Sequence, residues 1–155
     1  MEPKILPNQK VAEVELRYRT NVDPKDRAQV KSSQDAYKIF LESWNRNTIE
    51  YFEEFKILLL NRNHRVLGMS TLTKGSTTGT IVDIKQLLQY ALKTNASSII
   101  VAHNHPSGNL EPSEADRTIT RKIVVGCEAI EVKLLDHLII VHEGQYYSFA
   151  DEGVL

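Results

Sequence analysis

Cysteine is almost missing from this sequence, in which Cys127 stands alone. A lone cysteine cannot close an intrachain disulfide, and it cannot supply the several thiolates of a cysteine-based metal site. Long apolar runs are missing too. None approaches the roughly 18 residues of a membrane-spanning helix, and no apolar signal core follows Met1. We therefore expect a cytoplasmic protein with no membrane association.

A surplus of either charge is also missing. The chain has 19 basic and 20 acidic residues and a formal net charge of −1, so its charge does not support DNA binding. Its 41% apolar and 25% charged residues are ordinary for a globular protein. A chain of 155 residues is long enough to form one domain with a substantial core.

What the sequence does contain is a predicted strand that ends in two histidines. Residues 99–102 are apolar and rich in β-branched side chains, as expected for a strand buried on both faces. His103 and His105 follow directly. Because side chains alternate along a strand, the two imidazoles point the same way and Asn104 points the opposite way. The chain then turns at residues 106–108, where Gly108 permits a positive φ.

A helix is predicted to begin shortly afterwards, with Ser113 as its N-cap and Asp116 in its first turn. Asp116 can then face back toward His103 and His105. Two imidazoles and one carboxylate would form a three-ligand site that leaves a fourth position for water, the layout of a catalytic zinc. Two simpler interpretations stay open at this point. Ser113 and Asp116 have the spacing of a capping box, which needs no metal, and the histidines could be ordinary loop residues.

These residues resemble the motif of a known family. The letters HNHPSG at residues 103–108, followed by PSEAD at residues 112–116, are similar to the JAMM (MPN+, JAB) metalloprotease motif and, more narrowly, to its RadC branch. The resemblance runs from about residue 53 to the C-terminus. It implies one zinc ion per chain held by His103, His105 and Asp116, a cytidine-deaminase-like architecture, and a peptide or protein substrate.

The resemblance also implies catalytic side chains outside the ligand set. The family places a general base at the start of an upstream strand in a Glu-x-Phe pattern, which Glu53 matches. Strand alternation sends the neighbouring Glu54 to the opposite face, so only one of the two can serve. We expect Glu54→Gln to be silent in activity and stability, and the alternative is that both glutamates are solvated. Ser113 matches the family's serine near the oxyanion, where its hydroxyl can donate a hydrogen bond.

Full-length members of the RadC branch usually carry an N-terminal helix-hairpin-helix region, which residues 1–50 do not show. We interpret residues 1–155 as a single RadC-like JAB/MPN domain in which residues 1–50 form a short strand–helix extension. Alternating apolar side chains predict a strand over residues 12–18. A polar loop at 21–31 follows, and Ser32 and Asp35 then form a capping box that begins an amphipathic helix.

The remaining patterns predict an α/β domain with a mixed β-sheet sandwiched by helices. Asp83 caps a helix that leads into the histidine strand, and the helix from Ser113 runs to about Cys127, a core residue. The strands before and after the Asp83 helix should be parallel. Strands are predicted at residues 53–60, 65–73, 131–135, 138–141 and 146–149, with a flexible loop at 74–80.

Three other histidines need a structural interpretation. We predict that His137 is a core histidine paired with a polar neighbour, and a supporting role behind the metal ligands is the alternative. His64 lies in the predicted hairpin turn and His142 at a strand end. Both are expected to face solvent.

Three functions compete for this sequence. The first is a zinc peptidase or isopeptidase of JAMM type. The second, suggested by the RadC link, is a DNA-repair-associated protein or metal-dependent nuclease, although the three residues of an HNH nuclease are spread over a ββα unit. The third is a non-catalytic binding module, which a complete ligand set with a candidate base disfavours. A zinc deaminase is excluded because it needs His-x-Glu and Pro-Cys-x-x-Cys.

Overall fold

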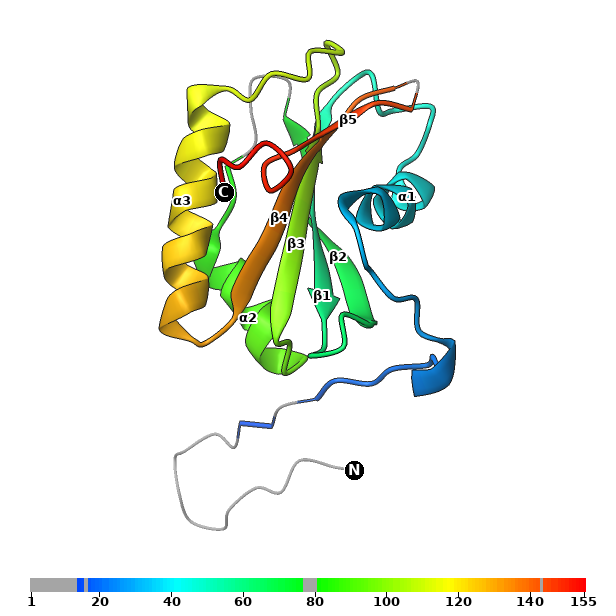
Figure 1. The fold of residues 1–155 in the computed structure, drawn as a ribbon, viewed down its shortest axis with the longest axis vertical. Helices are drawn as coiled ribbons and strands as arrows, with labels where there is room; N and C mark the ends of the chain where they lie inside the picture. Colours follow the sequence, from blue (N-terminus) through cyan, green and yellow to red (C-terminus); the bar gives the residue numbers. More distant parts are fainter. Residues whose placement is uncertain (1–13, 16, 77–80, 143) are drawn as a thin grey trace.

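A mixed β-sheet forms the central layer of the protein (Figure 1). The computed structural model describes residues 14–15, 17–76, 81–142 and 144–155. Within them the elements are η1 (Pro24–Asp26), α1 (Ser33–Ser43), β1 (Glu53–Leu60), β2 (Val66–Ser76), α2 (Ile84–Lys93), β3 (Ser98–Asn104), α3 (Glu114–Ala129), β4 (Lys133–Ile140) and β5 (Tyr146–Ser148). The strand order is β2-β1-β3-β4-β5. The pair β3 and β4 is parallel, and the other neighbouring pairs are antiparallel.

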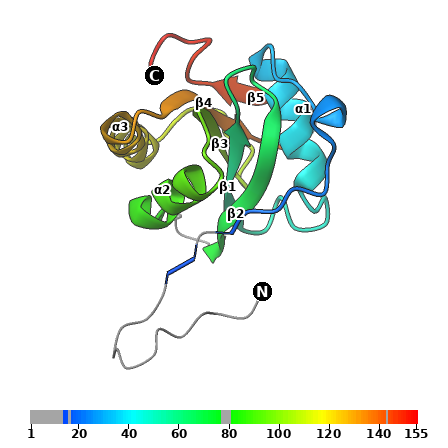
Figure 2. The same cartoon turned by 90° about the horizontal axis from the view of Figure 1, so that it is seen from below.

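Helices cover both faces of this sheet. Figure 2 shows α1 on one side and α2 with α3 on the other, so the layers run helix, sheet, helix. The prediction of a mixed sheet sandwiched by helices is therefore confirmed. None of the helices in the described ranges has the length and apolar content needed to cross a lipid bilayer.

Strand β1 shows how the sequence produces two cores. Its odd-numbered side chains, Phe55, Ile57 and Leu59, pack into the cluster under α2 and α3, whereas Leu58 and Leu60 pack under α1. Both β1 and the neighbouring β3 are buried along almost their whole length. A strand covered on both faces needs apolar residues at successive positions, which explains why these segments do not alternate with polar residues.

The connection from β2 through α2 to β3 places the histidine strand in the middle of the sheet. Both β2 and β3 pair antiparallel with β1, so they run in the same direction, as predicted, but β1 lies between them. The carboxylate of Asp83 begins α2 by accepting hydrogen bonds from the backbone N–H groups of Lys85 and Gln86. This capping was also predicted.

The structure corrects the prediction of two strands at residues 131–135 and 138–141, because a single strand β4 covers this region. Its register shifts by one residue opposite Ile99 and Ile100, so that Leu135 is the extra residue of a bulge. In the sequence, the polar pair Asp136 and His137 suggests that the strand is interrupted there. Both are buried, and the Asp136 carboxylate accepts hydrogen bonds from the Ser148 hydroxyl and from two backbone N–H groups.

Three smaller predictions also change. The strand expected at residues 12–18 lies partly outside the described residues, and its described part, residues 14–15 and 17–18, has no strand structure. Strand β2 runs on to Ser76, into the loop predicted at 74–80, of which residues 77–80 lie outside the described residues. At α1, Ser32 accepts from the N–H of Asp35 as predicted, but the Asp35 carboxylate accepts from the N–H of Lys31.

Candidate metal centre

The end of β3 carries the two predicted histidine ligands. His103 lies within the strand and is only 3% exposed. His105 follows the last strand residue, and its backbone N–H donates to the carbonyl of Ile140 on β4 (3.0 Å). This bond holds the chain against the sheet for one residue more, so that both imidazoles stay on the face covered by α3.

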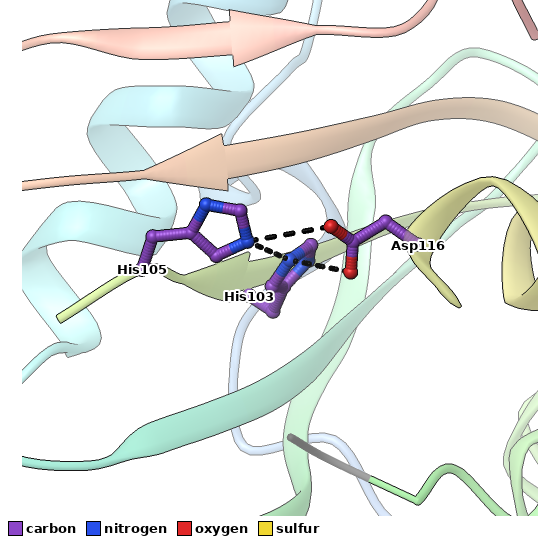
Figure 3. Close-up of side chains that lie close together, drawn as sticks. All are labelled: His103, His105 and Asp116. Carbon is purple, nitrogen blue, oxygen red and sulfur yellow. Dashed lines mark hydrogen bonds and ion pairs between the residues drawn. The ribbon is translucent and has the colours of Figure 1, made fainter. Parts of the chain in front are cut away.

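Asp116 approaches the two rings from the first turn of α3 (Figure 3). Its Oδ1 lies 3.1 Å from Nε2 of His103, and its Oδ2 lies 3.4 Å from Nε2 of His105. The two Nε2 atoms are 2.9 Å apart. One potential ligand atom from each residue lies within 4.8 Å of the others. The three residues predicted as metal ligands are thus together.

Ser113 combines the capping box with this cluster. Its backbone N–H donates to Oδ2 of Asp116 (2.7 Å), and the N–H of Asp116 donates to Oγ of Ser113 (3.1 Å). The cap therefore orients the same carboxylate that meets the histidines, so the two interpretations of the motif are compatible. Because the Ser113 oxygen accepts in the cap, its hydroxyl hydrogen remains available for a substrate.

A hydrogen bond on the side of the His105 ring away from Asp116 determines which ring nitrogen carries the hydrogen. Nδ1 of His105 lies 2.6 Å from the carbonyl oxygen of Asn109. A carbonyl oxygen only accepts hydrogen bonds, so Nδ1 carries the ring hydrogen. In the neutral imidazole, Nε2 then presents its lone pair to the cluster.

The ring of His103 is fixed in the same sense by a longer chain of bonds. Its Nδ1 lies 2.8 Å from Nε2 of His137, whose Nδ1 lies 2.7 Å from Oγ1 of Thr120. The Thr120 hydroxyl donates to the backbone carbonyl of Asp116 (2.6 Å), so its oxygen accepts from His137. Burial, together with the charge of His103, lowers the pKa of His137 well below its ordinary value and keeps this ring neutral. His137 therefore accepts from His103.

Two imidazole lone pairs and a carboxylate thus converge, and this arrangement requires a positive charge. Burial by itself would raise the pKa of the Asp116 carboxyl, but His103 and His105, which donate hydrogen bonds to it when a proton is bound at their facing nitrogens, hold that pKa well below its usual range. Burial lowers the pKa of His105, but in the protonated ring Nε2 donates to Asp116 and Nδ1 to the Asn109 carbonyl, and these bonds outweigh that effect and raise the pKa. Either a proton or a metal cation satisfies the group, and two imidazole nitrogens with one carboxylate oxygen are ligands that suit zinc.

The two candidate bases lie on opposite faces of β1. Glu53 precedes Phe55 by two positions and shares its face, and the Phe55 ring stacks on His103 with centroids 5.9 Å apart. The charge of Glu53 also contributes to the raised pKa of His105. Glu54 instead lies under α1, where it is 4% exposed and its Oε2 is 3.3 Å from Nζ of Lys56. Glu54 is therefore not a solvated residue, which corrects the expectation that its substitution would leave stability unchanged.

Asn104 connects the histidine strand to the segment that carries Glu53. Its side-chain oxygen accepts from the backbone N–H of Glu54 (2.7 Å), and its amide nitrogen donates to the carbonyls of Ile49 (2.7 Å) and Phe52 (3.0 Å). The side chain is fully buried and points away from the histidines, as alternation predicts. These three bonds fix the start of β1 beside the candidate metal centre.

Sequence reasoning found the ligand candidates and missed the residues behind them. Thr120 carried no signal, because a threonine inside a helix has many structural uses. His137 is buried and paired with a polar neighbour as predicted: its ring bonds to Thr120 and to His103, and its backbone N–H donates to Asp136. His64 and His142 are exposed, as expected. Cys127 is a free, buried core residue, and burial raises the pKa of its thiol to about 11.

Comparison with known proteins identifies the family of this chain. A family model described as the RadC-like JAB domain matches residues 30–154. The chain belongs to the RadC family. A UPF0758 protein of Flavobacterium johnsoniae is 49% identical over 102 residues, which are 66% of this chain and 44% of that protein. The RadC-like chain therefore spans less than half the length of this relative.

The family match begins at residue 30 and so includes α1, which lies before the region of motif resemblance that starts at about residue 53. Membership supports a metal-dependent hydrolase related to the JAMM enzymes. The His–His–Asp group in the structure agrees with metal binding of that kind.

Proposed function

We propose that this chain is a zinc-dependent metallohydrolase that cleaves an amide bond in a peptide or protein, as JAMM peptidases and isopeptidases do. The observation that carries the proposal is the convergence of His103, His105 and Asp116, with the ring hydrogens of both histidines held on the far side. A carboxylate at Glu53 shares the face of β1 that packs on His103. Together they supply a metal site and a base.

The proposal assigns the ligand role to Nε2 of each histidine and to the Asp116 carboxylate. Three protein ligands are typical of catalytic zinc sites, whereas structural zinc sites usually have four. Bound zinc supplies Lewis-acid chemistry, because it polarises a carbonyl and makes water acidic enough to lose a proton near neutral pH.

The chain's own residues would then carry out the proton transfers. Glu53 accepts a proton from the water that attacks the scissile carbonyl carbon, and it returns that proton to the nitrogen of the leaving amine. The Ser113 hydroxyl donates a hydrogen bond to the carbonyl oxygen as negative charge develops there. Asn104 holds the start of β1 so that Glu53 stays beside the histidines.

A side-by-side hydrolysis assay tests the proposal. The metal-free protein is incubated with peptide, isopeptide-linked and duplex DNA substrates, with and without one equivalent of zinc. We expect zinc-dependent cleavage of a peptide or isopeptide bond that is abolished by a chelator. Zinc-dependent cleavage of DNA alone would contradict the peptidase assignment.

Replacing Ser113 with alanine should separate its two roles. The variant should keep zinc, because no Ser113 atom belongs to the proposed ligand set. Its hydrolysis rate should fall roughly 10²–10³-fold if the hydroxyl stabilises the oxyanion. Loss of the helix cap should also reduce the free energy of unfolding by about 1 kcal/mol. Steady-state kinetics and urea unfolding measure the two effects.

Ser32→Ala is the matched control, since Ser32 caps α1 through a similar bond to the N–H of Asp35 (3.2 Å) and lies at another helix. It should cost similar stability and leave the rate unchanged. An equal loss of rate in both variants would show that Ser113 acts only through folding.

Binding to DNA is expected to be weak and sensitive to salt. The formal net charge of −1 offers little attraction for phosphates, and the affinity that does arise should fall steeply with salt concentration. Fluorescence anisotropy with a labelled duplex between low and physiological salt measures this. Tight binding that persists at physiological salt would favour the DNA-repair or nuclease alternative.

A further inference from the structure

The buried bonds behind His103 form a chain with one direction. The Thr120 hydroxyl donates to the Asp116 carbonyl, His137 donates to Thr120, and His103 donates to His137, over distances of 2.6, 2.7 and 2.8 Å. The direction is set at the carbonyl end, because a carbonyl oxygen cannot donate. All three side chains are at most 3% exposed. The order of donors is therefore fixed by the protein.

We propose that Thr120 and His137 are positioning residues that set the tautomer of His103, so that its Nε2 is free of hydrogen and ready to bind zinc. This inference rests on the zinc site of the proposed function and adds to it two residues that do not touch the metal. Histidine ligands commonly donate their second ring N–H to a carboxylate or carbonyl. Here the acceptor is a second imidazole, whose own tautomer has to be set in turn.

Packing leaves the His137 ring little freedom except the position of its hydrogen. The ring stacks on Phe149 with centroids 4.7 Å apart and planes 11° apart, and it makes an edge-type contact with Phe55 with centroids 5.5 Å apart. Its two nitrogens are thereby aimed at His103 and at Thr120. A neutral imidazole has one ring hydrogen, and only the acceptor at Thr120 directs this hydrogen to Nδ1.

Removing the Thr120 acceptor should reverse the order of donor and acceptor between His137 and His103. In Thr120→Val, which keeps the shape of the side chain, Nδ1 of His137 has no acceptor, and the ring hydrogen is better placed on Nε2. His137 then donates to Nδ1 of His103, and the hydrogen of the neutral His103 ring moves to Nε2. A hydrogen on that nitrogen opposes zinc binding, because the metal needs the lone pair.

Zinc affinity of the full chain, measured by chelator competition, is the first test. Thr120→Val should bind zinc roughly 10–100-fold more weakly, the loss typical of a partner behind a metal ligand. Thr120→Ser keeps the hydroxyl and should bind like the original protein. Thr118→Val, a matched substitution on the same helix, should also bind zinc like the original protein. Unchanged affinity in Thr120→Val, or equal losses in all three variants, would overturn the inference.

The tautomer itself is the second test, because a merely structural role would not change it. Long-range proton–nitrogen NMR of the metal-free protein should show the His137 hydrogen on Nδ1, and on Nε2 in Thr120→Val. A hydrogen on Nε2 in the original protein, or no change in the variant, would overturn the inference. This readout needs no zinc. Failure of the original protein to bind zinc would therefore refute the proposed function and leave the tautomer result standing by itself.

Discussion

Replacing Glu53 with glutamine should leave zinc bound and lower the hydrolysis rate by roughly 10²–10⁴-fold. Glutamine has nearly the same shape as glutamate but cannot accept the proton of the attacking water. Glu53 is outside the proposed ligand set, so the zinc content per chain should not change. Kinetics with a peptide or isopeptide substrate, together with elemental analysis of the same preparation, measure both quantities.

Glu54→Gln is the control for this experiment, and the structure changes what it should do. The rate per folded molecule should stay the same, because Glu54 lies on the α1 face of β1. The free energy of unfolding should fall by roughly 3–5 kcal/mol, since Lys56 would lose its partner in a buried ion pair. Full activity in Glu53→Gln with a crippled Glu54→Gln would show that the base is the other glutamate.

Replacing Asp116 with asparagine should remove most of the zinc and, with it, the activity. The amide has the size of the carboxylate but no negative charge, and its N–H₂ group can donate to the histidine nitrogens that should bind the metal. The loss of zinc affinity should exceed the roughly 10–100-fold expected for a residue behind the ligands. Elemental analysis after dialysis and chelator competition both measure this loss.

Glu114→Gln is the matched control for Asp116→Asn. Glu114 also lies in the first turn of α3, but its carboxylate pairs with Arg121 (3.1 Å) on the exposed side of the helix. The Glu114→Gln variant should keep its zinc content and its hydrolysis rate. Equal zinc loss in the two variants would point to a general effect of charge at this helix end and not to ligation.

The candidate metal group could be predicted because its geometry is local. His103 and His105 lie two residues apart on a strand, and Asp116 is placed by a helix cap whose spacing is visible in the sequence. Periodicity also separated Glu53 from Glu54. These inferences need only the repeat of a strand, the start of a helix and the short turn between them.

The supporting contacts could not be predicted, because they depend on the register between elements far apart in the chain. His137 meets His103 because β4 pairs in parallel with β3, with Val101 opposite His137. The bulge at Leu135 sets that register, and nothing in the residue pattern announces it. Thr120 reaches His137 and completes the series of hydrogen bonds only once α3 packs on β4. Such contacts follow from tertiary structure and not from sequence periodicity.

The buried ion pair of Glu54 and Lys56 is a similar case. Two charged residues at alternate positions near a strand end suggest a solvated edge in the sequence. In the structure, Nζ of Lys56 lies 4.6 Å from the ring centroid of Trp44 and donates to the Ser43 carbonyl. The end of α1 therefore covers this pair, and a charge pattern alone cannot show which helix will do so.

If His103, His105 and Asp116 form the metal centre, zinc must lie among their side chains. An anomalous difference map at the zinc absorption edge, from crystals of the full chain grown with zinc, shows where the metal binds. We predict one strong peak per chain between Nε2 of His103, Nε2 of His105 and the Asp116 carboxylate. A map with zinc bound only elsewhere, or with no peak among these three side chains, would contradict the claim.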